Sequence, residues 1–421
     1  MSNKKIKVGV LGAGRGMALV NVLTSHPDAE LVAICDQFEP LLMQCKKISD
    51  AVDKKIELYN SYDNFLNHDM DAVVLANYAN EHAPFAIELL SSGRHVLSEL
   101  MAVETLSQAV ALVEAVEKSG KVYAYAENCC YYATILEMKR LYQQGEIGNF
   151  LHGEGEYIHD CESIWPRLTR GERNHWRNRM YSSFYCSHSL GPIITITGTR
   201  PVKVVGFETP NVEYMAKLGY GAGTSAMEVI QMDNNATVKS LHGLLKREPS
   251  LHWFSIYGDK GMIETDRWHE HECRIHVYRE DSRLADTEIN YRAKYSYSTD
   301  SSEKILEHGG SDFYPIHHFL QKITGNTEKQ ESIDVYQALD MSLPGLLAYR
   351  SICNGNKPIE VPDFRKVEVR DKYRNDNWCT NDKVAGENIA PLCSFGSPKL
   401  PDSIYEDVRE MWVNKLKNKL F

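Results

Sequence analysis

Residues 6–36 read IKVGVLGAGRGMALVNVLTSHPDAELVAICD, and this stretch decides the fold of the first part of the chain. An apolar run over 6–12 ends in a glycine-rich turn, which leads into a helical pattern and then into a second apolar run. Strand, glycine-rich turn, helix and strand in this order are typical of a dinucleotide-binding fold, where backbone N–H groups at a helix N-terminus hold a pyrophosphate. The alternative is a glycine-rich surface loop between ordinary elements.

The glycine motif and the residue after the second apolar run predict which dinucleotide binds. Gly12 and Gly14 stand in the register of the dinucleotide fingerprint, but position 17 is methionine and the third glycine is Gly16. Asp36 ends the second run, at about the distance expected for a carboxylate that accepts hydrogen bonds from the adenosine ribose. Because a carboxylate there would repel a 2′-phosphate, the sequence favours NAD over NADP. The candidate cofactor residues of this segment are Gly12, Gly14, Arg15, Gly16, Met17 and Asp36.

Strand and helix patterns continue to alternate up to residue 127. Apolar strand patterns cover 71–76, 95–99 and 121–127, and helical patterns cover 82–92 and 105–118. This alternation predicts an α/β domain over 1–127, a doubly wound parallel sheet of the Rossmann type whose ligands lie at the carboxyl ends of the strands. The polar residues near these ends are further candidates for cofactor contacts: Asn77, Asn80, His82, Glu99 and Asn128.

A different pattern begins at about residue 128. One helical segment, 133–144, precedes long runs with the strand period of two, at 150–160, 202–209, 226–232, 236–244 and 252–265. Such a series predicts an α+β substrate-binding domain over 128–360 with a mostly antiparallel open sheet. Helical patterns follow near 312–323 and 333–353. Residues 361–421 are expected to form a C-terminal extension that packs on the other domains and ends in a helix over 402–420.

Two segments of this region are unlike strands or helices. Residues 163–187 are rich in Arg, Trp, Tyr and Ser, which fits a loop over a pocket better than a core. Residues 280–305 are strongly polar, and we expect an excursion or a mobile loop there.

The amino-acid composition and the net charge indicate which kinds of partner the protein can bind. Of 421 residues 43% are hydrophobic, the formal charge is −10, and the Lys and Arg residues are dispersed. These properties argue against nucleic acid or an anionic membrane as partner and favour a small neutral or cationic ligand. The N-terminal apolar run is too short for a signal peptide or a membrane span, so we expect a cytoplasmic protein. Ten irregularly spaced cysteines disfavour a disulfide framework or a metal site, and we expect most to be reduced and buried.

Tyrosine and histidine residues of the second domain form a candidate catalytic constellation. Tyr157 and His159 are two residues apart in GEGEYIHD, so on a strand they share one face, with Gly153 and Gly155 leaving room beside them. Tyr185 and His188 add a second phenol and imidazole. Glu127 adds a carboxylate at the edge of the first sheet, so five groups could transfer or hold protons. The alternatives are core residues for the rings and a helix cap for Glu127.

Several segments of the chain resemble one large family. The order of the two domains, the segment NEH after AVVLA and the phrase SIYGDKGMIE resemble the glucose-fructose oxidoreductase and inositol dehydrogenase family over about residues 5–350. A Glu-Lys-Pro tripeptide with a catalytic lysine is usual there, and Glu99, Leu100 and Met101 stand in its place. Of that family's Asp-x-Gly-x-His motif, which would fall on Phe184, Cys186 and His188, only the histidine remains.

Further segments resemble one branch, glycoside hydrolase family 109. They are HVLSELMAVET, AENCCYY, GEIGNFLHGEGEYIHD, NHWR, FYCSHSLGPI, HGGSDF and IDVYQAL. The resemblance implies an NAD-dependent retaining glycosidase with α-N-acetylgalactosaminidase activity, and it implies that Glu127, Tyr157, His159, Tyr185 and His188 are the active-site groups. A shorter segment between His159 and Tyr185, and Cys186-Ser187 where Pro-Thr is typical, leave the sugar open.

The sequence offers no clear carboxylate pair of the ordinary glycosidase kind, so NAD suggests another route. Hydride leaves C3 of the sugar for NAD, the ketone acidifies the C2 proton, the C1 substituent is eliminated, water adds, and the hydride returns. We assign His188 to the 3-hydroxyl and Tyr157 or Tyr185 to C2. Glu127 and His159 would orient the sugar or assist the leaving group.

The remaining expectations concern substrate contacts, assembly and rival functions. His175, Trp176 and Arg177 are candidates for sugar contact, with a structural loop as the alternative. An exposed sheet face in the second domain would suit a homodimer or homotetramer. The rivals are an NAD-dependent sugar dehydrogenase and a non-catalytic sugar or nucleotide sensor.

Overall fold

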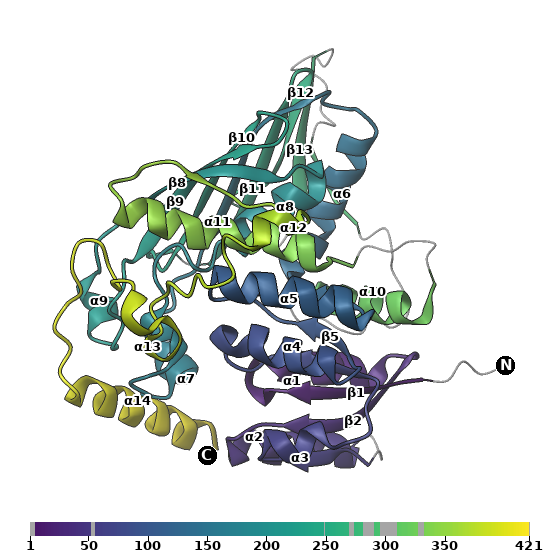
Figure 1. The fold of residues 1–421 in the computed structure, drawn as a ribbon, viewed down its shortest axis with the longest axis vertical. Coiled ribbons are helices and arrows are strands. Elements are labelled where there is room, and N and C mark those ends of the chain that lie inside the picture. Colours follow the sequence, from purple (N-terminus) through teal and green to yellow (C-terminus); the bar gives the residue numbers. More distant parts are fainter. Residues whose placement is uncertain are drawn as a thin grey trace. The chain divides into compact units, whose positions relative to one another are not determined.

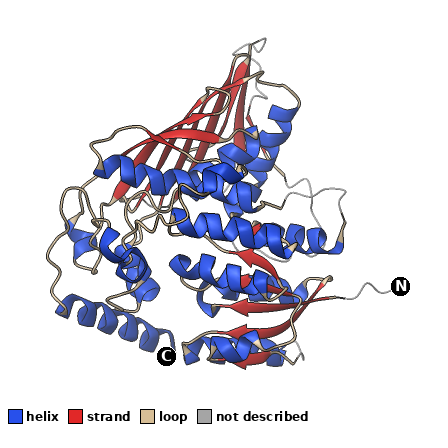
Figure 2. Cartoon of the chain, viewed as in Figure 1, coloured by secondary structure: helices blue, strands red, loops and turns tan. Residues whose placement is uncertain are grey.

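The computed structural model describes residues 5–51, 55–247, 249–268, 273–280, 290–294, 310–326 and 332–420. The chain divides into two compact units, each assembled from three stretches of sequence. Unit 1 comprises 1–136, 295–340 and 364–376, and unit 2 comprises 137–294, 341–363 and 377–421. Figures 1 and 2 show the helices and strands of the two units.

Unit 1 contains a six-stranded sheet in the order β3-β2-β1-β4-β5-β6, and every pairing in it is parallel. The strands are β1 (Ile6–Leu11), β2 (Ala29–Cys35), β3 (Glu57–Tyr59), β4 (Ala72–Leu75), β5 (His95–Ser98) and β6 (Tyr123–Tyr125). The helices include α1 (Ala13–Ser25), α2 (Glu39–Ala51), α3 (Tyr62–Leu66), α4 (His82–Ser91), α5 (Leu106–Ser119) and α10 (Phe313–Thr324), while α6 (Ala133–Gln143) begins in unit 1 and continues into unit 2. The predicted doubly wound sheet is confirmed, and strand order reverses between β1 and β4.

Local sequence explains why this sheet forms. The four residues of β4, AVVL, are all buried, as both faces of a parallel sheet are covered by helices. Helix α5 begins at the N-cap Thr105, whose side chain accepts a hydrogen bond from the Gln108 N–H. It ends at Gly120, whose φ of 61° suits glycine.

Unit 2 contains a nine-stranded sheet in the order β14-β13-β12-β11-β7-β10-β9-β8-β15. Its strands are β7 (Phe150–Ile158), β8 (Pro201–Glu208), β9 (Ser225–Met232), β10 (Thr237–Gly243), β11 (Leu251–Gly258), β12 (Gly261–Thr265), β13 (Arg274–Arg279), β14 (Asn290–Arg292) and β15 (Ile359–Glu360). The β10–β7 pair is parallel and the other described pairs are antiparallel. The expected mostly antiparallel sheet is therefore confirmed.

One face of this sheet is covered by helix α8 (Ser187–Thr197), drawn in front of the strands in Figure 1. A Cβ at Gly155 would lie 1.8 Å from the Ser189 carbonyl oxygen, and one at Gly153 would lie 3.1 Å from Ile193. The two glycines do leave room beside Tyr157, but α8 fills that room and leaves none there for a ligand. Helix α11 (Val335–Cys353) continues this layer at β8, where Ser351 Oγ accepts a hydrogen bond from Gly206 N–H.

Two expectations differ from the structure, and a third lies mostly outside the described residues. The run at 252–265 is two strands, β11 and β12, because Gly258 and Gly261 allow a tight turn at 259–260. Segment 163–187, expected to be a loop over a pocket instead of core, contains α7 (Trp165–Thr169) and a short 3-10 helix (Trp176–Arg179), and Trp165 is fully buried. Most of the expected polar excursion at 280–305 lies outside the described residues.

The C-terminal extension is mostly irregular, with three short helices and the final helix close to where the sequence predicts it. They are α12 (Val367–Arg370), α13 (Asp382–Ala385), a 3-10 helix (Gly386–Asn388) and α14 (Ser403–Leu420), while α9 (Glu213–Ala216) completes unit 2. Residues 364–376 belong to unit 1, where Arg370 pairs with Glu117 of α5. Residues 377–421 belong to unit 2.

Two further observations concern the oxidation state of the cysteines and the possibility of a membrane span. All ten cysteines are free, and all but Cys273 and Cys353 are buried. In the part of the chain that the structure describes, the helices are too short or too polar to cross a bilayer.

Candidate active site

The glycine-rich turn of unit 1 is built for close backbone approach. Gly12 has a φ of 93°, and a Cβ there would lie 2.4 Å from the backbone nitrogen of Asn77. Gly16 sits on the face of α1 that packs on the sheet, because its Cβ would lie 3.0 Å from Val10 Cγ1 and 3.3 Å from Ala76 Cβ. Gly16 thus does what the third glycine of the fingerprint does, allowing close helix–strand packing, although it stands one position early.

Asp36 follows β2 directly, as expected, and its carboxylate accepts two backbone hydrogen bonds, one of them from the start of α1 just after the glycine-rich turn. Oδ2 accepts a hydrogen bond from Ala13 N–H at 2.7 Å, and Oδ1 accepts one from Phe38 N–H at 2.7 Å. A carboxylate oxygen can accept a second hydrogen bond, and Asp36 is only half-buried. The residue can therefore hold the glycine loop and still meet a ribose hydroxyl.

The segment after β4 carries polar atoms that have no partner among the described residues. Asn77 Oδ1, Asn80 Oδ1 and His82 Nε2 are buried there without a hydrogen bond. His82 is 1% exposed, and its Nδ1 donates to the Met101 carbonyl at 3.1 Å, which leaves Nε2 as an acceptor. Burial lowers the pKa of His82 to about 4, so the imidazole is neutral near pH 7.

These features fit a dinucleotide. Buried unpaired acceptors are costly unless a ligand pairs with them, and they line the same sheet edge as the open turn at Gly12 and the carboxylate of Asp36. The amide and hydroxyl groups of NAD supply suitable donors, and the backbone of the turn suits a pyrophosphate.

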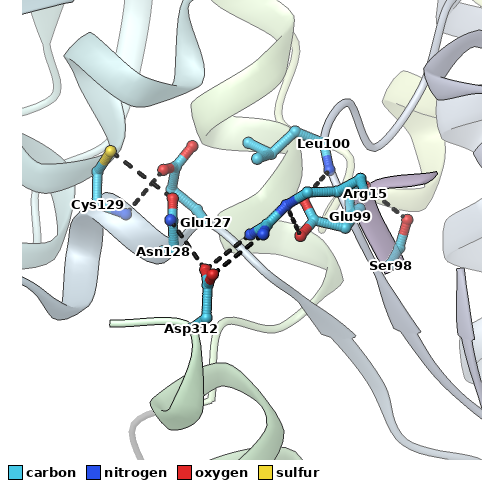
Figure 3. A network of polar contacts seen from close by, with 8 residues as sticks. All are labelled: Arg15, Ser98, Glu99, Leu100, Glu127, Asn128, Cys129 and Asp312. Atoms are coloured by element: carbon cyan, nitrogen blue, oxygen red, sulfur yellow. Dashed lines mark hydrogen bonds and ion pairs between the residues drawn. The ribbon is translucent and has the colours of Figure 1, made fainter. Parts of the chain in front are cut away.

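Arg15, which is half-buried, takes part in the network of polar contacts shown in Figure 3. Its Nη1 and Nη2 donate to Asp312 at 3.0 and 2.7 Å, and its Nε lies 3.0 Å from Glu99 Oε1. Asn128 Nδ2 donates to the same Asp312 at 3.1 Å. Asp312, which the sequence left without a role, thus joins two predicted cofactor residues, Arg15 and Asn128, and Arg15 contacts a third, Glu99.

Glu127 ends the short stretch after β6 and is fully buried. Its Oε1 accepts a hydrogen bond from Cys129 N–H at 3.1 Å, so it caps the 3-10 helix over Asn128–Tyr131. The capping role considered for Glu127 is therefore real, and it fixes the carboxylate at the carboxyl edge of the sheet. Burial, together with the Glu127 charge, raises the pKa of the Cys129 thiol well above its usual value.

In unit 2 the predicted tyrosines and histidines form one cluster, which we call the ring cluster: Tyr157, His159, Tyr185, His188 and His252. Tyr157 and His159 lie at the carboxyl end of β7, and the Tyr157 hydroxyl is 3.1 Å from His159 Nδ1. The Tyr157 ring centroid is 4.6 Å from that of His188 and 6.3 Å from that of Tyr185. Close packing of α8 on Gly155 brings His188, near the start of α8, to Tyr157.

His252 is the member that sequence reasoning missed. It is the cross-strand partner of Tyr157, and the two ring centroids lie 5.0 Å apart. Strands β7 and β11 are about a hundred residues apart and not consecutive, so only the sheet order reveals the pair. The one available signal was a histidine within an otherwise apolar strand.

His159 is held in its neutral form. Burial and the charges of His252, Arg177 and His188 lower its pKa to about 4. A neutral imidazole whose Nδ1 lacks a proton can accept one from the Tyr157 hydroxyl. The pair can therefore move a proton between phenol and imidazole near pH 7.

The three predicted sugar-contact residues have different surroundings. His175 is 4% exposed and caps the following 3-10 helix by accepting a hydrogen bond from Arg177 N–H. Burial and the charges of Arg177 and Arg170 lower its pKa to about 3. Trp176 stacks near Tyr185, with centroids 6.5 Å apart, and the Arg177 guanidinium lies 4.4 Å from the Trp176 ring. Trp176 and Arg177 thus extend the ring cluster, whereas His175 supports their turn.

Similarity to known proteins agrees with this arrangement. Residues 6–127 match the oxidoreductase family with an NAD-binding Rossmann fold. A glycosyl hydrolase family 109 protein 1 from Phocaeicola vulgatus is 25% identical over 404 residues, 86% of this chain and 84% of the relative. A glycosyl hydrolase family 109 protein from Porphyromonas gingivalis is 23% identical over 419 residues, 90% of this chain and 86% of the relative.

Solved structures share the fold at lower identity. An oxidoreductase from Agrobacterium radiobacter in complex with NAD+, L-tartaric acid and magnesium aligns with a TM-score of 0.66 and 17% identity, covering 85% of this chain and 99% of that chain. The WlbA dehydrogenase from Bordetella pertussis, in complex with NADH and UDP-GlcNAcA, aligns with a TM-score of 0.65 and 19% identity, covering 86% and 99%. Residues 131–371, more than half of the chain, match the C-terminal domain of glycosyl hydrolase 109. The chain therefore belongs to glycosyl hydrolase family 109 and is an NAD-dependent enzyme with an N-terminal Rossmann domain.

Proposed function

We propose that the protein is a glycosidase that cleaves its substrate by transient oxidation at C3, elimination across C1 and C2, water addition and re-reduction. The observation that carries the proposal is the ring cluster, which gathers two phenols and three imidazoles on one sheet face. A simple alcohol oxidation needs one proton acceptor, whereas this route needs several proton transfers at different sugar atoms.

NAD, when bound, supplies the acceptor for the C3 hydride and returns that hydride at the end, so no net oxidation results. The chain's own residues handle the protons. His188, 8% exposed at the start of α8, takes the proton of the 3-hydroxyl as the ketone forms and returns it later.

Removal of the C2 proton needs a stronger base than a neutral phenol. Tyr157 can act as this base because its hydroxyl can pass its proton to the neutral His159 at 3.1 Å. Tyr185, whose centroid is 5.1 Å from that of His188, is the second choice for C2 or a contact for the sugar. As the C2–H electrons form the C1–C2 double bond, the C1–O bond breaks and Glu127 or an imidazole protonates the leaving oxygen.

We propose α-N-acetylgalactosaminides as the first substrates to test, because the resemblance to family 109 implies that activity. Trp176 and Arg177 would contact the sugar by stacking and hydrogen bonding. Among the cofactor residues, we propose that Gly12, Gly14, Gly16 and Asp36 hold the dinucleotide loop and that Asn77, Asn80 and His82 bind its polar groups.

The test is proton NMR of the full-length protein in deuterated water with catalytic NAD and a panel of α- and β-glycosides. The proposal expects hydrolysis, deuterium at C2 and no accumulated NADH. Stoichiometric NADH with a keto sugar and no cleavage would instead identify a sugar dehydrogenase. Tight binding of NAD with neither sugar hydrolysis nor formation of a keto sugar would instead indicate a non-catalytic sensor.

Assembly and location are also proposals. The face of the unit 2 sheet opposite α8 exposes apolar side chains on several strands, namely Phe207, Val229, Tyr257 and Tyr278. Such a face suits a homo-oligomer, and a sedimentation experiment that found only monomer at micromolar concentration would reject it. A cytoplasmic location rests on the sequence, and fractionation of cells tests it.

A further inference from the structure

The face of the unit 2 sheet that packs against α8 carries a buried acid and imidazole that the proposed mechanism does not use. Glu228 on β9 is 0% exposed and His242 on β10 is 2% exposed. A hydrogen bond joins them, with 2.7 Å between Glu228 Oε1 and His242 Nε2. We call them the Glu228–His242 pair. Their neighbours on the same face of β9 and β10 are mostly apolar and buried, namely Ala226, Ile230, Met232 and Val238.

The Glu228–His242 pair is an unusual way to fill this layer. Glu228 Oε2 is buried without a hydrogen-bond partner among the described residues, and an unpaired buried oxygen is unfavourable. Apolar side chains of similar volume, in place of a buried polar pair, often give the same or a higher stability. Packing alone therefore does not explain the pair, and its position beside the ring cluster indicates another role.

His242 stands beside Tyr157 on the sheet. It is the register partner of Tyr157 in the parallel β10–β7 pairing, and His252 is the partner of the same tyrosine in the antiparallel β11–β7 pairing. Side chains of residues paired in this way lie on the same face of the sheet. His242, Tyr157 and His252 therefore form one row across three adjacent strands, with Tyr157 in the middle.

The end of β10 is also bound to the segments that carry two histidines of the ring cluster. The Gly243 carbonyl accepts a hydrogen bond from the His159 N–H at 3.0 Å. Ser240 Oγ lies 2.8 Å from Ser189 Oγ of α8, and Ser189 is the residue after His188. The strand end that the Glu228–His242 pair fastens to β9 thus contacts both segments directly.

We propose that Glu228 and His242 are positioning residues for removal of the C2 proton. The hydrogen bond between them fixes the His242 ring on the β10 side of Tyr157, while His252 lies on the β11 side. The phenol then stays within hydrogen-bond distance of His159, 3.1 Å away, as the transfer of its proton requires. Glu228 acts as a hydrogen-bond partner and not as a charge, and neither residue of the pair exchanges a proton with the sugar. This role rests on the proposed function, in which Tyr157 is the base at C2.

Two substitutions of Glu228 separate a hydrogen-bond partner from a side chain that only fills space. Glutamine and methionine are both close to glutamate in size. Because glutamine has an acceptor oxygen and N–H donors, Glu228→Gln can keep the hydrogen bond to His242 in either direction, whereas Glu228→Met offers only a weak acceptor. Asp266→Leu is the matched control, since Asp266 pairs with His276 at 3.1 Å on β13, a strand that contributes no member of the ring cluster.

The first measurement needs no sugar. It records the ring-nitrogen chemical shifts of the full-length protein with isotope-labelled histidine, and His242→Gln and His159→Gln assign the two rings of interest. We expect Glu228→Met to shift the signals of both rings, and Glu228→Gln and Asp266→Leu to leave the His159 signals in place. Unmoved His159 signals in Glu228→Met, or an equal movement in Asp266→Leu, would overturn the proposal.

The second measurement is steady-state kinetics on a glycoside that the NMR panel shows to be cleaved. We expect Glu228→Met to lower kcat about tenfold or more with little change in KM, because a misplaced reacting group slows the chemical step. Glu228→Gln should turn over at close to the wild-type rate.

Two kinetic results would contradict the positioning role. If Glu228→Gln is as slow as Glu228→Met, the charge of Glu228 is needed, and if Glu228→Met keeps full kcat, the hydrogen bond is not. Should Glu228→Met not fold, His242→Gln takes its place, because it removes the imidazole and keeps a donor and an acceptor for Glu228; full kcat in that variant is equally decisive.

Failure of this role and failure of the proposed function can be told apart. If no glycoside is cleaved, the glycosidase is rejected, and the ring-nitrogen shifts still decide whether the Glu228–His242 pair acts on His159.

Discussion

Tyr157 on β7 and His252 on β11 are direct cross-strand partners, and their ring centroids lie 5.0 Å apart. Because His252 is also the first of the charges that lower the pKa of His159, its removal should raise that pKa from about 4. We predict that His252→Gln moves the acid limb of the pH–rate profile to higher pH, since His159 then protonates earlier. The profile of kcat/KM between pH 4 and 8 measures this.

His276→Gln is the matched control for His252. His276 lies on β13 of the same sheet, where it pairs with Asp266 instead of with the ring cluster. An acid limb that stays in place in His252→Gln, or that moves equally in His276→Gln, would show that His252 does not act on His159.

Gly155 determines how closely α8 approaches β7. A Cβ there would lie 1.8 Å from the Ser189 carbonyl oxygen, which is backbone and cannot move alone. We predict that Gly155→Ala lowers the free energy of unfolding by at least about 1–3 kcal/mol and reduces kcat, because His188 moves with α8. Urea unfolding and steady-state kinetics measure the two effects.

Gly221→Ala in the same unit is the control, because its Cβ would make ordinary contacts at 3.4 and 3.6 Å with Leu392 and Leu400. Equal stability of the two variants would mean that α8 adjusts without cost.

Local patterns explain how much of this structure the sequence could predict. The strands at 71–76 and 95–99 were predictable because a buried parallel strand is a short apolar run, and the glycine turn fixed their topology. Tyr157 and His159 were predictable as neighbours because residues two apart on a strand share a face. The domain limits at 127 and 360 stay predictions, since the two units interleave along the chain.

Contacts between residues far apart in the sequence could not be predicted from local sequence patterns. Arg15 and Asp312 are 297 residues apart, and nothing in the glycine motif indicates that its arginine turns to α10. The prediction for segment 163–187 was wrong about the core, because its aromatic and arginine residues suggest a loop over a pocket, while Trp165 packs in a core with Met215 and Val408. In both cases tertiary partners decided the outcome.

Asp36 should decide which dinucleotide binds. We predict that Asp36→Ala raises the dissociation constant of NAD about tenfold or more, since a hydrogen bond to a charged group contributes about 1.5–3 kcal/mol. The Asp36→Ala variant should also discriminate less against NADP, because it lacks the carboxylate that would repel the 2′-phosphate. Asp71→Ala is the control, since Asp71 accepts a hydrogen bond from Lys7 N–H at the other end of β1. Unchanged relative affinity for NAD and NADP in Asp36→Ala would contradict the assignment.

His82 should make the protein sensitive to acid. Its folded pKa is about 4, below the ordinary value of 6.5, because burial disfavours the charged imidazole. The neutral residue therefore contributes its full stability above about pH 6.5, and this contribution is lost as pH falls toward 4, at up to about 1.4 kcal/mol per pH unit. We predict that His82→Gln flattens the decline of the urea midpoint between pH 7 and 5. His26→Gln should flatten it similarly, because burial lowers the pKa of His26 to about 4 as well. The same slope in wild type and in both variants would mean that other groups control acid unfolding.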